Sequence, residues 1–300
     1  MADKPRILFI IVNYRRAELC VQFAHAILNL PAADQVKIVI VDNSEMRADQ
    51  EELSQLASHK NVFVRTPSRN LGFYGGADFG YSSLESSGAT LDWIIVCNPD
   101  IDFPDSSFLL QLLNITPDND VGVLAPDIRL APHKELWEEG AQQNPMMEKR
   151  PSKFRLRLLE VIFRSRILYR AMELRHRWRS KTPRTKTPAP RRRLIYAAHG
   201  SAIIFAKNYF RQGGSLRHGS FLYGEELFVA EELRLRNLKC VLEPTLHLCH
   251  VGGATTGALG SERQRLFCYD SMRFIRTRYF SSSDAKNSRK RLSQSDSTKP

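Results

Sequence analysis

The sequence lacks any apolar run near the roughly 20 residues that a bilayer-spanning helix requires, so it predicts no membrane span. Its first apolar run, Ile7–Val12, is short and has no small-residue cleavage site, so we expect no secretory signal. Core-forming residues are not scarce, because 42% of the 300 residues are hydrophobic. That fraction suffices for one large core or two modest ones and argues against a chain that is disordered throughout.

Cysteine is also scarce. The chain has five cysteines, and none of them stands in a CxxC pair. An odd number without that spacing argues against a disulfide framework and against a cysteine-based zinc site. We therefore expect buried thiols and a protein of the reducing cytoplasm.

Acidic residues are the minority charge, but the imbalance is confined to one segment. Residues 149–193 contain 17 lysines and arginines against 2 glutamates, a net charge of +15. The whole chain carries +12, so the other 255 residues carry −3. Most of the chain is therefore an ordinary, slightly acidic globule.

The order of apolar patterns predicts an α/β fold. Continuous apolar runs are typical of strands buried on both faces, and an apolar residue every three to four positions is typical of helices. Their alternation predicts βαβ units and a Rossmann-like, mostly parallel sheet. We expect strands over 7–12, 36–41, 62–65, 91–97 and 202–205, and helices over 17–30, 49–56, 75–87 and 227–238.

Polar residues follow each of the first four strands. In open parallel sheets, ligands bind outside the carboxyl ends of the strands. Four such clusters in chain order therefore predict a ligand site at this edge. The clusters are Asn13-Tyr14, Asp42-Asn43-Ser44, Asn70 to Gly76 and Asn98-Pro99-Asp100.

Asn98-Pro99-Asp100 has two interpretations. All three residues favour turns, so the segment could be a plain turn after a strand. Alternatively, the Asp100 carboxylate is a hard oxygen ligand that suits Mg²⁺ or Mn²⁺ bridging a diphosphate. Taken with the other clusters, we favour the metal role.

Asp42 is expected either to accept hydrogen bonds from a nucleobase or ribose, or to cap the next helix, and the two roles are compatible. Gly72, Gly75 and Gly76 would let the backbone approach a ligand closely. The glycine pattern matches neither GxGxxG nor GxxxxGK[ST], so it is weak evidence for a phosphate loop.

Glu225 and Glu226 follow the aromatic, glycine-containing segment Phe221–Gly224. Adjacent residues point about 100° apart on a helix, so one carboxylate can face a cleft while the other supports it. A carboxylate in a shaped cavity can act as a general base. The plainer interpretation is a solvated helix start, where acidic residues interact favourably with the helix dipole. His250 is similarly open to a structural role or to completing a metal site with Asp100.

Six of these segments together resemble the inverting family 2 glycosyltransferases, which have the GT-A fold. They occur in the family's order and span most of residues 5–255, and the closest likeness is to the bacterial rhamnosyltransferase-like branch. The segments are 11–14, 41–44, 70–73, Asn98-Pro99-Asp100, 221–226 and 244–250. Asn98 stands where the family's Asp-x-Asp motif has its first aspartate, a common variant in this branch.

The resemblance implies a nucleotide-sugar donor and a divalent metal, Mg²⁺ or Mn²⁺. It implies Glu226 as the catalytic base with Glu225 beside it, and Asp100 and His250 as metal-binding residues. Asp42 would contact the nucleobase. The full set of implied donor-binding residues is Val12, Asn13, Tyr14, Asp42, Asn43, Asn70, Gly72, Asn98 and Asp100.

The basic segment lies outside the resemblance. We expect a helix over 154–178, then a Pro-rich linker, so that 148–193 interrupts a domain of residues 1–280. A solvated excursion and nucleic-acid binding are alternatives, but no nucleic-acid motif accompanies the charge. We favour an amphipathic helix on an anionic membrane surface. Its expected apolar face comprises Phe154, Leu158, Val161, Ile162, Leu168, Tyr169 and Met172.

The resemblance and the basic segment together predict a cytoplasmic, peripherally membrane-associated glycosyltransferase. Its acceptor would be a hydroxyl of a glycan or lipid-linked glycan in bacterial surface polysaccharide synthesis, and it would bind no nucleic acid. Two alternatives remain: a nucleotidyltransferase, and a catalytically degenerate scaffold that docks on membranes. Residues 281–300 are rich in Ser, Lys, Arg and Asp and are expected to be a disordered tail.

Overall fold

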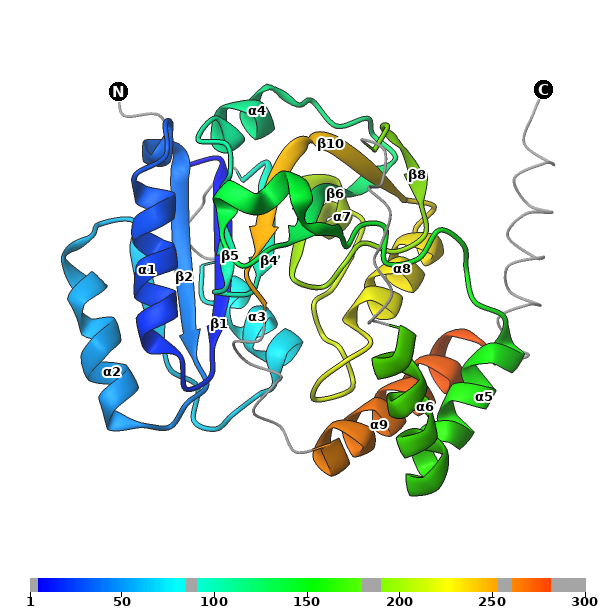
Figure 1. Ribbon diagram of the computed structural model, residues 1–300. Helices are drawn as coiled ribbons and strands as arrows, with labels where there is room; N and C mark the ends of the chain where they lie inside the picture. The colour runs from blue at the N-terminus through cyan, green and yellow to red at the C-terminus, as the bar shows by residue number, and fades with distance from the viewer. Residues whose placement is uncertain (1–4, 85–90, 180–189, 253–260, 282–300) are drawn as a thin grey trace, which may run out of the picture.

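The computed structural model describes residues 5–84, 91–179, 190–252 and 261–281, without the side chains of residues 176–179 and 261. The described chain forms one ten-stranded mixed sheet with helices on both faces (Figure 1). Its strand order is β3-β2-β1-β4-β9-β6-β10-β5, with β7 pairing with β6 and β8 with β10. The predicted α/β fold with a mostly parallel sheet is confirmed, whereas the expected tail lies almost wholly outside the described residues.

The N-terminal half of the sheet is entirely parallel. It comprises β1 (Ile7–Asn13), β2 (Val36–Asp42), β3 (Val62–Arg65) and β4 (Trp93–Cys97). Every residue of β1 is buried, as its continuous apolar run predicts. Because β1 lies between β2 and β4, the polar residues that follow all three strands meet at one edge.

The second half of the sheet mixes directions. The strand β9 (Ala202–Ala206) is antiparallel to both β4 and β6 (Val121–Leu130), and β10 (Lys239–His250) is parallel to β6. Three short strands complete the sheet: β5 (Ile101–Asp102), β7 (Ala141–Gln142) and β8 (Arg193–Ile195). Pairing of β10 with β5 brings His250 beside Ile101, directly after the Asn98–Asp100 segment.

Alternate residues of β1 face two hydrophobic cores. Ile7, Phe9 and Ile11 pack with α1 (Ala17–Leu28), α2 (Arg47–Ser54) and α4 (Phe108–Asn114) on one face. Leu8, Ile10 and Val12 pack with the helices of the other face. These are α3 (Phe73–Ser82), α5 (Lys153–Arg164), α7 (Lys207–Arg211), α8 (Glu225–Leu235) and α9 (Ser261–Tyr279).

Most predicted elements are present with shifted ends. The helix expected over 75–87 is α3, which ends at Ser82, and residues 85–90 lie outside the described part of the chain. Three-residue to six-residue 3-10 turns occur at Ala33–Gln35, Gln55–Ser58 and Lys134–Glu139. All five cysteines are free thiols, and four of them are buried, as expected.

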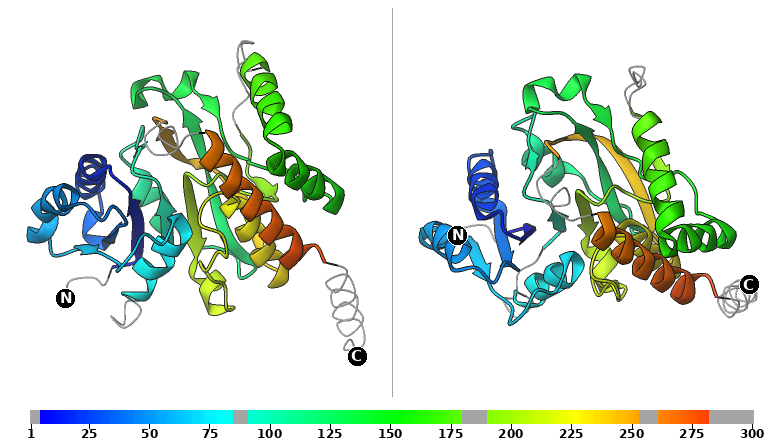
Figure 2. Two further views of the ribbon diagram at one scale, coloured as in Figure 1. Left: turned by 90° about the horizontal axis from the view of Figure 1, so that it is seen from below. Right: turned by 60° about the horizontal axis from the view of Figure 1, so that its bottom comes forward.

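The helix predicted over 154–178 is wrong in one respect. It is two helices, α5 and α6 (Arg166–Arg179), because Ser165 has extended backbone angles (φ −96°, ψ 121°) and its hydroxyl accepts a hydrogen bond from the Leu168 N–H. Arg265 of α9 holds this break, since its guanidinium donates to the carbonyl oxygens of Phe163 and Arg164. Figure 2 shows α5 and α6 on the opposite side of the molecule from α1 and α2.

The core packs against a face of α5 other than the apolar face that the sequence predicted for a membrane surface. Leu156 is fully buried, and Leu159 and Phe163 pack beside it. Of the predicted apolar face, Phe154, Leu158, Val161 and Leu168 are exposed, whereas Tyr169 is buried. Phe154 is 76% exposed and Leu158 is 48% exposed. Apolar residues occupy both faces of α5, so helical spacing alone did not identify Leu156 as the core-facing residue. Among the described residues, no helix has the length and apolar composition needed to cross a bilayer.

The two faces of α5 make a matched pair for a stability test. Leu156→Ala removes a fully buried side chain and should lower the free energy of unfolding by about 2–5 kcal/mol. Leu158→Ala should cost less than about 0.5 kcal/mol, because the side chain is half exposed. Denaturant unfolding of both variants checks the assignment; an equal cost at the two positions would contradict it.

Candidate active site

Buried hydrogen bonds join the ends of β1 and β2. The Asn13 side-chain amide donates to Asp42 Oδ1 (2.9 Å), Ser44 Oγ (2.9 Å) and Asp49 Oδ2 (2.8 Å). Asn13 and Asp42 are 0% and 1% exposed, so these polar groups require partners within the protein. The Ser44 hydroxyl also accepts from the Arg15 N–H, which fixes the chain after β1. Asn13 and Asp42 thus form a buried support at the strand ends.

The neighbouring Asn43 fixes the loop before α3. Its Nδ2 donates to the Gly72 carbonyl (2.8 Å), and its Oδ1 accepts from the Leu71 N–H (3.3 Å). Asn70 Oδ1 accepts from the Gly72 N–H. Gly72 has φ +75°, and a Cβ there would lie 2.1 Å from the Phe221 carbonyl oxygen. Only glycine permits this close approach of the loop to residue 221.

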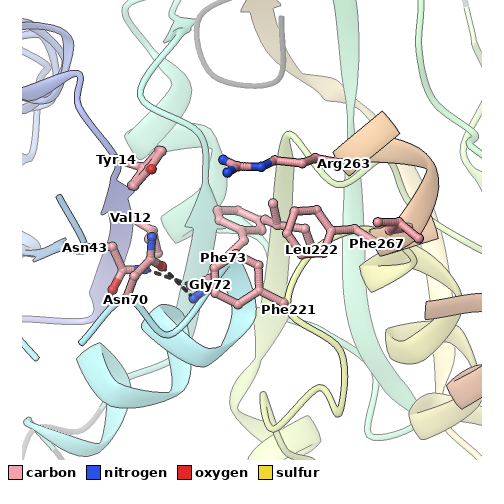
Figure 3. Close-up of a pocket in the computed structure, with 11 residues that line it drawn as sticks. Val12, Tyr14, Asn43, Asn70, Gly72, Phe73, Phe221, Leu222, Arg263 and Phe267 are labelled. Carbon is pink, nitrogen blue, oxygen red and sulfur yellow. Dashed lines mark hydrogen bonds between the residues drawn. The ribbon is translucent and has the colours of Figure 1, made fainter. Parts of the chain in front are cut away.

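A pocket of about 330 Å³ opens beside this loop (Figure 3). One wall comes from the strand ends and α3, and the other from residues 221–222 and α9. Most of its lining is apolar or aromatic, which is typical of small-molecule sites. The lining residues are Val12, Tyr14, Asn43, Asn70, Gly72, Phe73, Phe221, Leu222, Arg263, Leu266 and Phe267. Five expected donor-binding residues are among them, whereas Asn13, Asp42, Asn98 and Asp100 are not.

A second group of polar residues gathers after β4 and at the end of β10. Asp100 Oδ2 lies 3.4 Å from His250 Nε2, and both side chains are largely buried. His250 Nδ1 lies 2.8 Å from Gln143 Oε1. With Gln143 as the acceptor, Nδ1 carries a hydrogen, and Nε2 is the ring atom that faces Asp100. The structure therefore brings the two predicted metal-binding residues together.

The pair fits a partial metal site. Two ligands at right angles, each about 2.1 Å from a Mg²⁺ ion, lie about 3.0 Å apart, close to the 3.4 Å observed. The described residues contain no group of three or more candidate metal ligands. Mg²⁺ commonly binds one or two protein ligands together with substrate phosphates and water. Asp100 and His250 are thus suited to a metal that a phosphorylated ligand helps to hold.

A strained turn places the two glutamates. Tyr223 and Gly224 both have left-handed backbone angles (φ 68° and 80°), and α8 begins directly after them. The Ser271 hydroxyl of α9 donates to the Tyr223 carbonyl (2.6 Å). A Cβ on Gly224 would lie 2.1 Å from that hydroxyl, so this position requires glycine. The turn directs Glu225 and Glu226 to different surroundings.

Glu225 is buried, and Glu226 is partly exposed beside Gly200. Burial, and then the charge of Glu226, raise the pKa of Glu225 above the ordinary carboxyl value. Burial also raises the pKa of Glu226, while a hydrogen bond from the Gly200 N–H opposes that rise. The two adjacent carboxylates thus differ in exposure, with Glu225 buried and Glu226 partly exposed.

Residues 199–201 connect Glu226 to the Asp100–His250 pair. The Ser201 carbonyl accepts from the Asn98 N–H, and the His199 ring lies 6.0 Å from the His250 ring, between centroids. Burial, and then His250, lower the pKa of His199 to about 4, so its ring is neutral. Sequence reasoning missed His199 and Gln143. A His-Gly step before a strand is the only signal for His199, and Gln143 has none.

The chain was compared with known proteins. The sequence pattern of the family described as Glycosyl transferase family 2 matches residues 8–212. A mannosyltransferase from Pyrobaculum calidifontis, solved with GDP-Man and Mn²⁺, is 13% identical with a TM-score of 0.49, over 85% of this chain. GalNAc-T7, solved with UDP, GalNAc and Mn²⁺, is 12% identical with a TM-score of 0.55, over 86% of this chain.

The chain covers 59% and 45% of the lengths of these two proteins. At such low identity, the likeness to GalNAc-T7 concerns the fold alone. Among curated proteins, no relative matches the sequence.

The buried Glu225 should make stability depend on pH. Its pKa is higher in the folded than in the unfolded chain, so its contribution to stability is present below the ordinary value of 4.5 and is lost as the pH rises. Glu225→Gln should therefore raise the melting temperature by a few degrees at neutral pH and by little near pH 4.5. Melting curves across this range measure the difference.

The exposed Glu139→Gln is the control and should give a flat difference. A constant difference between wild type and Glu225→Gln across the same range would contradict a raised pKa of Glu225 in the folded chain.

Proposed function

The chain belongs to glycosyl transferase family 2, and we propose that it is an inverting, metal-dependent glycosyltransferase with Glu226 as its catalytic base. Its activity class and GT-A fold follow from the family and the mostly parallel sheet. The observation that carries the proposed mechanism is the position of Glu226, whose partly exposed side chain lies beside Gly200. The adjacent His199 lies beside His250 of the Asp100–His250 pair.

The pocket supports the proposed binding of the donor's nucleobase. Its apolar and aromatic lining suits a nucleobase, and the fixed amide of Asn43 and backbone of Gly72 give it a rigid floor. Asp42, which was expected to contact the base, lies buried behind this lining. We therefore assign Asp42 the role of holding Asn13 and the strand ends in place, and assign Val12, Tyr14 and Asn43 the contacts with the base.

The Asp100–His250 pair supports the proposed binding of the donor's diphosphate through a metal ion. Asp100 and His250 would hold Mg²⁺ or Mn²⁺, and that metal would stabilise the negative charge of the diphosphate leaving group. Gln143 holds the His250 ring through Nδ1, which is how ligating histidines are commonly oriented. Asn98 N–H is bonded to Ser201, so its backbone fixes the segment rather than the ligand.

Glu226 supplies the proton acceptor. The acceptor hydroxyl would lose its proton to the Glu226 carboxylate as its oxygen attacks the anomeric carbon from the face opposite the diphosphate. A raised pKa makes the carboxylate a stronger base once it is ionised. Glu225 is the buried neighbour of Glu226. While Glu225 is protonated, it places no negative charge beside Glu226, so Glu226 can ionise without repulsion from it.

The donor and acceptor are proposed from the likeness of the motifs to the rhamnosyltransferase-like branch. We propose dTDP-rhamnose or a UDP-sugar as donor, and a glycan or lipid-linked glycan of bacterial surface polysaccharide synthesis as acceptor. A lipid-linked acceptor would require the enzyme to work at a membrane surface.

We propose that this association is at the cytoplasmic side of the membrane. The exposed apolar residues of α5 and α6 support membrane association. Phe154 (76%), Ile167 (80%) and Leu174 (66%) are strongly exposed. Each basic residue near an anionic bilayer contributes about 1 kcal/mol of attraction. Exposed arginines surround the apolar residues: Arg155, Arg157, Arg164, Arg166, Arg170 and Arg175. This combination suits an interfacial helix pair.

Glu226→Gln tests the base. The substitution keeps the shape of the side chain but removes the proton acceptor, so kcat should fall by about 100-fold to 10,000-fold while donor affinity changes little. Initial-rate kinetics and donor binding measure the two effects, with Glu139→Gln as the control. Turnover at the wild-type rate would remove Glu226 from the role.

Substitutions on the exposed face test membrane binding. Deleting the whole segment would also remove the buried Leu156 and the Arg150–Glu231 ion pair (2.6 Å), so point substitutions are cleaner. Phe154→Asp with Ile167→Asp should weaken cosedimentation with phosphatidylserine vesicles about tenfold or more. Leu110→Asp, at a 44% exposed site on α4, is the matched control. Undiminished binding of the double variant would refute the proposed face.

A further inference from the structure

The helix α9 forms one wall of the pocket although it lies outside the family match. The match ends at residue 212, and α9 spans Ser261–Tyr279. Arg263, Leu266 and Phe267 of this helix line the pocket opposite the strand ends. Their spacing of three and four residues places them on one helix face. The pocket is thus completed by a part of the chain that the family pattern does not describe.

Arg263 is the one charged residue in the pocket lining. Its guanidinium extends across the mouth of the pocket toward Tyr14 (Figure 3). The adjacent Glu262 is engaged elsewhere, because its carboxylate pairs with Arg265 and Arg166. Within the described part of the chain, Arg263 takes part in no ion pair. An otherwise uncharged, aromatic pocket therefore has a single cation at its opening.

The rest of α9 holds this cation in a fixed place. Ser271 donates to the carbonyl of Tyr223, in the turn that carries Glu226. On the other side, Arg265 donates to the α5 carbonyls, and Arg276 pairs with Glu160 of α5 at 2.5 Å. A helix held from both sides provides a rigid base for a binding residue.

The two kinds of lining chemistry select one class of ligand. The Phe221 and Phe267 rings lie 5.2 Å apart between centroids, at an angle of 32°, and offer apolar surface for a planar base. A guanidinium offers paired donors in a planar fork, a geometry that matches phosphate oxygens. A ligand with a base at one end and phosphates next to it satisfies both.

We propose that Arg263 binds the phosphates of the donor, and that α9 thereby makes the pocket selective for nucleotides over nucleosides. This inference rests on the proposed function, since it assigns a further residue to the same donor site. Arg263 would complement the Asp100–His250 pair, which can reach the diphosphate only through a metal. A directly bonded guanidinium would retain part of the nucleotide affinity when metal is removed.

Two variants at matched positions on α9 test the inference. Arg263→Gln removes the charge and keeps much of the side-chain length, and Arg273→Gln does the same at an exposed position that does not line the pocket. Titration calorimetry with UDP, GDP and dTDP, in Mn²⁺ and in EDTA, identifies the nucleotide that wild type binds. The corresponding nucleosides, uridine, guanosine and thymidine, form the second arm.

Arg263→Gln should weaken binding of the preferred nucleotide about tenfold or more, because the variant loses a hydrogen-bonded pair between opposite charges. Arg273→Gln should bind the nucleotide with wild-type affinity. Arg263→Gln and wild type should bind the corresponding nucleoside with equal affinity. The residual nucleotide binding seen in EDTA should also depend on Arg263.

Three results would overturn the inference, and they are separable from failure of the proposed function. Wild-type nucleotide affinity in Arg263→Gln would remove the phosphate contact and leave the transferase proposal standing. An equal loss for nucleotide and nucleoside would show that Arg263 contacts the base or shapes the pocket. If wild type binds none of the three nucleotides, the proposed donor site fails and the inference fails with it.

Discussion

The turn at Phe221–Gly224 is the constraint on which the site depends. Two successive residues in left-handed backbone angles reverse the chain sharply, and a non-glycine residue, Tyr223, bears part of that strain. Contacts on both sides maintain the turn. Gly72 admits the Phe221 carbonyl from the strand-end side, and Ser271 bonds the Tyr223 carbonyl from α9. The base, the pocket wall and the C-terminal helix therefore share one backbone segment.

The same arrangement explains why the two cores of the protein serve different purposes. The core containing α1, α2 and α4 covers one face of the sheet and contributes none of the pocket lining. The core on the other face contains α3, α8 and α9, which supply Phe73, the glutamate pair and Arg263. Chemistry is thus concentrated where the strand ends and the second helical layer meet. This edge is where open α/β sheets bind ligands.

Much of the strand-end half could be predicted because its signals are local. Buried parallel strands have continuous apolar sequences, and the polar residues that follow them mark the ligand edge. Tyr14, Asn43, Asn70 and Gly72 were placed at this edge from the sequence, and the family resemblance added Val12. Asp42 shows the limit of this reasoning. A carboxylate after a strand can face the ligand or the buried network, and only the three-dimensional packing decides between them.

The parts that were missed depend on long-range packing. Both faces of α5 carry apolar residues, so the choice of Leu156 over Leu158 as the buried residue depends on what α9 and the core present to the helix. Gln143 and His199 reach His250 from distant positions in the chain, and Arg263 reaches the pocket from α9. No spacing rule connects such residues before the fold has brought them together.

The central claim is that the pocket and the Asp100–His250 pair form one donor site for a nucleotide sugar and a metal. A thermal-shift panel of UDP-, dTDP- and GDP-sugars, each with Mn²⁺ or EDTA, tests it most directly. The account predicts a rise in melting temperature for one nucleotide class that is larger with Mn²⁺ than with EDTA. No shift with any of these donors, or an equal shift with and without Mn²⁺, would contradict it and favour a non-catalytic scaffold.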